Sequence, residues 1–322
     1  MATYSKLPSG NWRAQFIVDG KRRSLTRPTR RECAKAVELF EGIDAADMTV
    51  GRAIEEYISA REGTFSPSTL YGYRNIQRYH FSELTKRPLA DVNEALLNSV
   101  ISAEAKKYSP KTVRNAWGLL RASLSPHLPV DRWRIQLPQK AKKEISVPTD
   151  EEVRALLERA AGTDMELPIR LAAFCGLRRS EICALTFGDV RNGYVTIDKA
   201  MVMGADRKYH VKKPKSYAGY RTIKLPSNID VGTGEPSERL TRLTPNNLSD
   251  NCLIMSHRQI SMHQLRHYYA SVLLKLGVPN KYAARQMGHS GEEMLQRVYQ
   301  HLFPEQSAEY DARIAEAVST DF

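Results

Sequence analysis

Two arginines, two histidines and a tyrosine in the C-terminal half of the sequence have the side chains needed for chemistry on a phosphate. They are Arg178, His263, Arg266, His289 and Tyr299. An arginine fork binds two phosphate oxygens at once and stabilises the charge of a pentavalent transition state. Histidine exchanges a proton near neutral pH, and tyrosine, with a pKa of about 10 in water, needs such help to attack. Together these residues indicate phosphoryl transfer with a tyrosine nucleophile.

The segment around Arg178 predicts a junction between two helices. An apolar helix is expected over residues 168–175, and Gly176 ends it. Residues 177–181 follow and lead into another apolar helical run. A guanidinium at such a junction can point into a cleft. The simpler interpretation is a surface arginine, or one paired with Glu181.

Most of the eight histidines lie between residues 257 and 301. Ser261 is expected to cap a helix there, and Gln264, three residues later, completes a capping box. His263 and Arg266 then leave the same face of the first turn, because they are three residues apart. Apolar residues on another face are expected to hold this helix in the core: Leu265, Tyr269, Val272 and Leu276.

Two further helices are expected to present the last two candidates. The first covers about residues 281–287, ends at Gly288 and places His289 just past its end. Ser290 and Glu293 suit the start of the second helix, which leads to Tyr299.

A lysine is expected to approach the same site from a hairpin. Three strand-like pieces precede the histidines, at residues 194–202, 209–213 and 220–225. The hairpin expected between the last two carries Lys212, Lys213 and Lys215. A lysine on a hairpin can reach into a cleft from the side, although most such lysines are simply solvated.

Metal chemistry is disfavoured. Zinc could in principle be bound by His263, His267 and His289, but the sequence has no H-E-x-x-H motif, and Arg266 between the first two would repel a cation. No cluster of Asp and Glu lies beside the candidates, which argues against a two-metal nuclease. We therefore expect neither a metal nor another cofactor.

The net charge of +12 favours a polyanionic partner, because Lys and Arg gain affinity by releasing the counterions of phosphates. No apolar run approaches the roughly 20 residues that span a bilayer, and residues 1–6 lack the apolar core of a signal peptide. The four cysteines are scattered: Cys33, Cys175, Cys183 and Cys252. This spacing predicts buried free thiols in a reducing compartment and a cytoplasmic protein without a membrane partner.

The N-terminal half divides into two segments. In the first, residues 12–18 alternate like a strand, Asp19-Gly20 predicts a hairpin turn, and Thr29 can cap a helix. Lys and Arg predominate there, which suits DNA phosphates or a groove. The second segment predicts four helices, with Ser66-Pro67 and Ser109-Pro110 opening two of them. A plain structural bundle fits this second pattern equally well.

The ordered motifs in the C-terminal part closely resemble the tyrosine recombinase, or phage integrase, family. They are Gly176-Leu177-Arg178-x-x-Glu181, His263-x-Leu265-Arg266-His267, Gly288-His289-Ser290 and Tyr299-x-His301. The ten-residue step from His289 to Tyr299 matches the spacing usual in the family. Gln264 departs from the family, which commonly has an aspartate there.

The resemblance implies a multi-domain α+β fold. Its parts would be an arm-type DNA-binding domain with a three-stranded sheet and a helix (residues 1–45) and a helical, SAM-like core-binding domain (47–127). A basic linker (128–147) would lead to a mixed, mostly α-helical catalytic domain with a small antiparallel sheet and a C-terminal tail (148–322).

The resemblance also implies catalytic roles. Arg178, His263, Arg266 and His289 would surround the scissile phosphate, and Tyr299 would attack it to form a 3′-phosphotyrosine. Lys213, with Lys215 as the alternative, would protonate the leaving 5′ oxygen. Such an enzyme would integrate or excise a mobile element of a phage or conjugative transposon in a bacterial cell. Four protomers would act on two duplexes at attachment sites, with scope for an accessory bending or excision factor.

Two other functions remain open at the level of sequence. A DNA-binding protein without catalysis, such as a repressor, explains the charge and the three segments but not why every catalytic position is occupied. A type IB topoisomerase shares the chemistry but relaxes supercoils as a monomer. The basic N-terminal segment and the C-terminal tail favour recombination.

Overall fold

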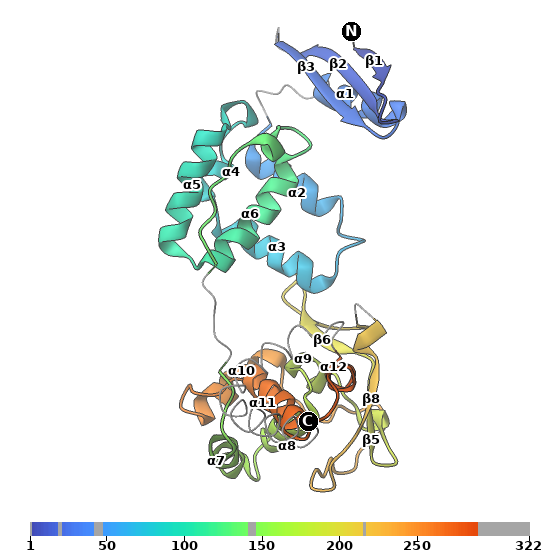
Figure 1. The fold of residues 1–322 in the computed structure, drawn as a ribbon, viewed down its shortest axis with the longest axis vertical. Coiled ribbons are helices and arrows are strands. Elements are labelled where there is room, and N and C mark those ends of the chain that lie inside the picture. Colours follow the sequence, from blue (N-terminus) through green and yellow to red (C-terminus); the bar gives the residue numbers. More distant parts are fainter. Residues whose placement is uncertain (1, 19–20, 42–47, 141–145, 215–216, 289–322) are drawn as a thin grey trace, which may run out of the picture. The chain divides into compact units, whose positions relative to one another are not determined.

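The computed structural model describes residues 2–18, 21–41, 48–140, 146–214 and 217–288. The chain divides into two compact units, Met1–Ala141 and Lys142–Phe322 (Figure 1). Among the described residues, no helix is both long and apolar enough to cross a membrane. All four cysteines are buried free thiols, as predicted.

The first unit begins with a three-stranded antiparallel sheet. Its strands lie in the order β1 (Thr3–Lys6), β2 (Trp12–Val18) and β3 (Lys21–Arg27). Helix α1 (Arg30–Glu41) packs against β2, and Thr29 accepts a hydrogen bond from the Glu32 amide at its first turn. Because successive strand residues point to opposite faces, Ala14 and Phe16 meet Cys33 and Val37 in a small core. The predicted sheet and helix are confirmed.

The rest of this unit is helical. Its elements are α2 (Val50–Ser59), α3 (Pro67–Tyr79), α4 (Ser82–Thr85), η1 (Leu89–Asp91), α5 (Glu94–Lys107), α6 (Pro110–Leu124) and η2 (Val130–Arg132). Ser66 and Ser109 cap α3 and α6, each followed by proline in the first turn, so both predicted helix starts are confirmed. One apolar core joins α2, α5 and α6 through Ile54, Leu97 and Leu120.

The stretch after η2 packs on the helices, although its sequence shows no period. The side-chain nitrogen of Asn98 on α5 donates to the carbonyl of Arg134 at 3.0 Å, and its side-chain oxygen accepts from the backbone amide of Gln136 at 2.8 Å. Arg114 on α6 donates to the carbonyl of Pro138 at 2.8 Å. The segment expected as a linker therefore begins as a chain fixed to α5 and α6.

The second unit is built around two packed helices. Helix α11 (Met262–Lys275) lies against α8 (Glu166–Cys175), and both are surrounded by α7 (Asp150–Ala160), α10 (Pro245–Met255) and α12 (Asn280–Met287). Short α9 (Arg179–Ile182) follows α8 directly. Leu171 and Leu265 are completely buried where α8 and α11 meet.

The strands of this unit pair differently from the prediction. The sheet order is β4 (Val190–Arg191), β5 (Tyr194–Ile197) and β8 (Arg221–Lys224), while β6 (Ala200–Met203) and β7 (Tyr209–Lys212) form a separate hairpin. The predicted hairpin between residues 209–213 and 220–225 is therefore wrong. The expected strand 194–202 is broken after Ile197, where Lys199 turns away and binds Asp189 at 2.7 Å. Val195, Ile197 and Ile223 bury one face of β5 and β8, which fixes their pairing.

One residue expected in the core is not there. Leu265 is buried, and Tyr269 and Val272 are partly buried, but Leu276 is 73% exposed. Helix α11 ends at Lys275, and Gly277 has a positive φ of 67°, so the chain leaves the core before Leu276 can face it.

We expect Leu120→Ala to lower the free energy of unfolding of the helical region by about 2–5 kcal/mol, because it leaves a cavity among α2, α5 and α6. Urea denaturation measures this loss. The exposed Asn115 on the same helix supplies the control, and Asn115→Ala should change stability by less than about 0.5 kcal/mol. Equal losses in the two variants would contradict the assigned core.

Candidate active site

A sharp turn after α8 presents Arg178. Helix α8 ends at Cys175, and Gly176 continues with a φ of 64°, a conformation that favours glycine. A Cβ atom at Gly176 would also collide with the ring of Tyr269. The chain reverses within this turn, so Arg178 lies at the junction of α8 and α9, as predicted.

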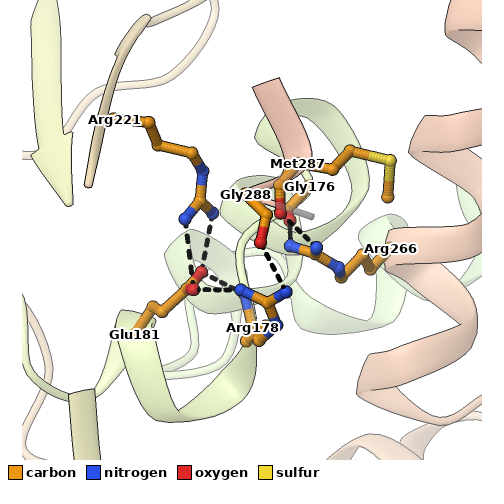
Figure 2. Close-up of polar contacts among 7 residues, drawn as sticks. All are labelled: Gly176, Arg178, Glu181, Arg221, Arg266, Met287 and Gly288. Carbon is orange, nitrogen blue, oxygen red and sulfur yellow. Dashed lines mark hydrogen bonds and ion pairs between the residues drawn. The ribbon is translucent and has the colours of Figure 1, made fainter. Parts of the chain in front are cut away.

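Glu181 accepts hydrogen bonds from two arginines that are distant in sequence. Arg178 Nη1 donates to Glu181 Oε1 at 2.7 Å, and the Arg178 amide donates to Oε2 at 2.9 Å. Arg221 Nη1 donates to Oε1 at 3.1 Å and Nη2 to Oε2 at 2.7 Å. Figure 2 shows the carboxylate between these two guanidiniums. The interpretation of Arg178 as paired with Glu181 is thus correct, and it does not remove Arg178 from the site.

Arg266 lies beside this group and is completely buried. Its guanidinium donates to the carbonyl oxygens of Gly176 and Met287 (Figure 2). Arg178 Nη2 donates to the carbonyl of Gly288 at 2.9 Å. Both predicted arginines therefore meet at the C-terminal end of α12, directly before His289 in the sequence.

The charges of this cluster are unbalanced. Among the described residues, Arg178 and Arg221 bind one carboxylate, that of Glu181, and the charge of Arg266 acts on the same group. Burial raises the pKa of Glu181, but the hydrogen bonds and charge of Arg221, with Arg178 and Arg266, bring it to about 2. Burial and the charge of Arg178 lower the pKa of Arg266. A cluster with excess positive charge is stabilised by an anion, and a phosphate suits guanidinium forks.

His263 and His267 lie next to the arginines on α11. His263 is in the first turn, and its ring meets that of His267 edge-on, with centroids 4.5 Å apart. Burial and the nearby Arg266 and Arg178 lower the pKa of His263, so the imidazole is neutral at pH 7 and can accept a proton. Burial lowers the pKa of His267 to about 4. Within the described ranges no three His, Cys, Asp or Glu side chains gather as metal ligands.

Of the remaining candidate site residues, the structure describes Lys213 alone. Lys213 is exposed and directly follows β7, on the connection to β8 rather than in a hairpin of these two strands. Lys215, His289 and Tyr299 lie outside the described residues.

Sequence reasoning missed Arg221. The alternation of β8 buries residues 221 and 223, so an arginine occupies a position that faces the core. A charged residue at an inward strand position predicts a buried ion pair, because an unpaired buried charge is costly. That signal was available in the sequence, but the partner could not be identified without the fold.

This arrangement defines a mostly α-helical domain that gathers arginines around the buried carboxylate of Glu181. Residues 149–306, which contain every predicted site residue, match the phage integrase family. The C-terminal part of the chain, residues 149–306, therefore belongs to this family of tyrosine recombinases.

Two curated relatives support this membership. The chain is 23% identical over 208 residues to a tyrosine recombinase XerC-like protein of Caldanaerobacter subterraneus, covering 52% of this chain and 53% of that protein. It is 24% identical over 222 residues to tyrosine recombinase XerA of Pyrococcus furiosus, covering 66% and 77%. The match therefore spans about half the length of the first of these relatives.

Solved structures share the fold. The Tn1549 transposon integrase in complex with transposon right end DNA gives a TM-score of 0.65 at 20% identity, covering 83% of this chain and 100% of that one. A lambda integrase tetramer bound to a Holliday junction gives a TM-score of 0.59 at 16% identity, covering 92% and 94%.

Gly288 tests how tightly the site is packed. Its φ is 62°, and an added Cβ atom would lie 2.7 Å from Arg221 Nη1. Gly277 has a similar φ of 67°, but no atom lies within 4 Å of its added Cβ. Both Gly→Ala variants should lose about 1 kcal/mol from backbone strain, and Gly288→Ala should lose more through crowding. Equal losses in thermal denaturation would contradict the close approach of Arg221.

The pairing of Glu181 also predicts a pH dependence of stability. Its folded pKa of about 2 lies below the ordinary glutamate value of 4.5, so its contribution is complete above pH 4.5 and is lost as the pH falls toward 2. The stability difference between wild type and Glu181→Gln should therefore shrink as the pH falls through this window. Urea unfolding at a series of pH values measures it, and a constant difference would refute the low pKa.

Proposed function

We propose that the chain is a site-specific DNA recombinase that integrates or excises a mobile element without a metal or other cofactor. The observation that carries this proposal is that Arg178 and Arg221 bind Glu181, while Arg178 and Arg266 bind carbonyl groups at the end of α12. The excess positive charge suits a phosphodiester, and the family motif puts the nucleophile Tyr299 eleven positions after Gly288 in the sequence.

In the proposed reaction, the Tyr299 oxygen attacks the scissile phosphorus and the bond to the 5′ oxygen breaks. Arg178 is 35% exposed at its side chain, so it retains N–H groups that can reach a phosphate oxygen. Arg266 contributes positive charge from beneath. Neutral His263 suits an acceptor for the proton of the nucleophile or a donor to a phosphate oxygen, and His289 completes the set.

The leaving 5′ oxygen takes a proton from Lys213, with Lys215 as the alternative. The products of this step are a 3′-phosphotyrosine and a free 5′ hydroxyl. The hydroxyl of the partner strand then attacks the phosphotyrosine, which restores a phosphodiester and releases the tyrosine. One phosphodiester replaces another, so the reaction needs no external energy source.

The partner is double-stranded DNA at attachment sites, bound by four protomers on two duplexes. The solved relatives support this because their structures contain transposon end DNA and a tetramer at a Holliday junction. We assign the reaction to the cytoplasm of a bacterial host, at the nucleoid, with an accessory bending or excision factor as a further partner.

The N-terminal sheet is proposed as the arm-type DNA-binding domain. Helix α1 covers one face of the sheet, and the other face exposes polar and basic side chains together with Ile17. The exposed residues on β2 and β3 that face this way are Arg13, Gln15, Arg22, Ser24 and Thr26. Such a face combines groups that bind phosphate with groups that read base edges. In the same proposal residues 47–127 form the core-binding domain and residues 148–322 the catalytic domain.

Covalent trapping tests the proposed function. Wild type and Tyr299→Phe are incubated, in EDTA, with a nicked duplex taken from the ends of the element that encodes the chain. We expect a covalent complex on a 3′ phosphate with wild type only, because the phenol oxygen is the nucleophile. Tight binding without a covalent complex would instead favour a repressor, and supercoil relaxation without joining of two sites would favour a type IB topoisomerase.

A second experiment tests the sheet. We expect Arg13→Ala combined with Arg22→Ala to weaken binding to arm-site duplexes and to reduce the salt dependence by about one ion per lost phosphate contact. Arg31 is an exposed residue of α1, the helix that covers the opposite face of the sheet. Arg31→Ala also removes a positive charge and serves as the control. Equal effects of Arg31→Ala and the double variant, measured by fluorescence anisotropy at several salt concentrations, would refute the assignment of the face.

A further inference from the structure

Arg221 lies among the site arginines but is not one of the residues that the family motifs mark. It is the first residue of β8, where it pairs with Ile197 of β5 and points to the buried face. Only 7% of its surface is exposed. A buried arginine carries a large desolvation cost, so its contacts must compensate for it.

Its contacts lead to Arg178. Both terminal nitrogens of Arg221 bind Glu181, at 3.1 and 2.7 Å, and the same carboxylate binds the side chain of Arg178 at 2.7 Å. Rotation about its last side-chain bond would leave the orientation of the Glu181 carboxylate unfixed if no partner held it. With Arg221 holding both oxygens from one side, the edge offered to Arg178 is fixed.

Arg221 also contacts the end of α12. An added Cβ atom on Gly288 would lie 2.7 Å from Arg221 Nη1 and 3.1 Å from the carbonyl oxygen of Ala218. The carbonyl of Gly288 is the second acceptor of Arg178, at 2.9 Å. Arg221 therefore binds one of the groups that hold Arg178, the carboxylate of Glu181, and lies close beside the other, Gly288.

Arg221 also lies at the end of the chain connection that carries Lys213. Residues 213–220 join β7 to β8 and contain Lys213 and the short helix η4 (Tyr217–Gly219). Strand β7 pairs with β6 and not with β8, so no ladder with β8 fixes the start of this connection. Its far end is fixed at Arg221 by the ion pair with Glu181.

We propose that Arg221 is a positioning residue for strand cleavage: by clamping Glu181 and packing beside Gly288 it holds Arg178 in place, and it anchors the connection that carries Lys213. This inference rests on the proposed function. Arg221 itself does not touch the reacting phosphate in this account, because its terminal nitrogens are occupied by Glu181.

Removal of Arg221 should change the protonation of Glu181. Among the described residues, the charged groups that face Glu181 are Arg178, Arg221 and Arg266. The titratable Cys175 and Tyr269 also face Arg221. Burial raises the pKa of Glu181, and Arg221 is the strongest opposing partner. Without Arg221, Glu181 takes up a proton at a higher pH and then releases Arg178.

The first test is the pH profile of single-turnover cleavage with the nicked duplex used for covalent trapping. We expect Arg221→Met to cleave about 100-fold more slowly than wild type near pH 7, the size typical of a misplaced catalytic group. The ratio of variant to wild-type rate should rise with pH, as Glu181 ionises again. Arg221→Lys, which keeps the charge, should recover part of the rate.

A matched control separates this role from general charge loss. Lys224 lies on the same strand, on its exposed face, and Lys224→Met removes the same charge. We expect it to leave the shape of the pH profile unchanged. An Arg221→Met profile parallel to that of wild type, at a rate lowered equally at every pH, would reduce Arg221 to a packing residue and overturn the proposal.

Chemical rescue provides a second readout. Arg221 lines a cavity of about 320 Å³ together with Thr222, Tyr220, Arg285 and Gln286, so truncation to alanine opens a path from this cavity to Glu181. Methylguanidinium, at concentrations that leave the melting temperature unchanged, should restore cleavage by Arg221→Ala and not by Arg178→Ala. Methylammonium should restore less, because it lacks the fork. No rescue, or equal rescue by both ions, would contradict the paired contact with Glu181.

A measurement without DNA distinguishes failure of this inference from failure of the proposed function. The gap in melting temperature between wild type and Arg221→Met should widen as the pH rises from about 2, because wild type gains stability as Glu181 ionises, whereas the variant buries this carboxylate without its strongest partner. A gap independent of pH would refute the clamp whether or not the chain cleaves DNA. A widening gap without covalent product in wild type would refute the function alone.

Discussion

The site depends on the ion pairs that the carboxylate of Glu181 forms with Arg178 and Arg221. Burial alone would favour its neutral form, yet two guanidiniums and a backbone amide hold it ionised, with a pKa of about 2. The same contacts satisfy Arg221, which would otherwise be costly to bury, and hold the partly exposed Arg178. Among the described residues one carboxylate faces three guanidinium groups, so the cluster keeps an excess of positive charge. Structure and chemistry thus share one ion-pair network.

Backbone carbonyl groups also hold arginines of the site in place. Arg266 joins the turn at Gly176 to the end of α12 through the carbonyls of Gly176 and Met287, and Arg178 binds the next carbonyl, that of Gly288. Helix ends have carbonyl groups without helical partners, so these contacts also cap α8 and α12. These contacts hold together the turn at Gly176, helix α11 and the end of α12, which are far apart in the sequence. Gly176 and Gly288 lack a side chain, so neighbouring groups can approach the backbone closely.

Local signals in the sequence predicted most of the helices and the two turns of the site. The capping box of Ser261 and Gln264, and glycines 176 and 288 with positive φ, follow from rules that act within a few residues. The pairing of β7 with β6 depends on long-range packing, which the pattern of residues 194–225 does not encode locally. Arg221 was missed for the same reason, since its partner is 40 positions away in the chain. Leu276 was misassigned because helical periodicity cannot indicate that the helix stops one residue earlier.

The central claim is that Glu181 organises the arginines for cleavage rather than for DNA affinity. The most direct measurement compares DNA binding and single-turnover cleavage by Glu181→Gln, which keeps the size of the side chain and removes its charge. We predict that the dissociation constant changes by only a few fold while cleavage slows by about 100-fold or more, with near-ultraviolet circular dichroism confirming the folded state. Equal loss of binding and cleavage, or cleavage at the wild-type rate, would contradict the account.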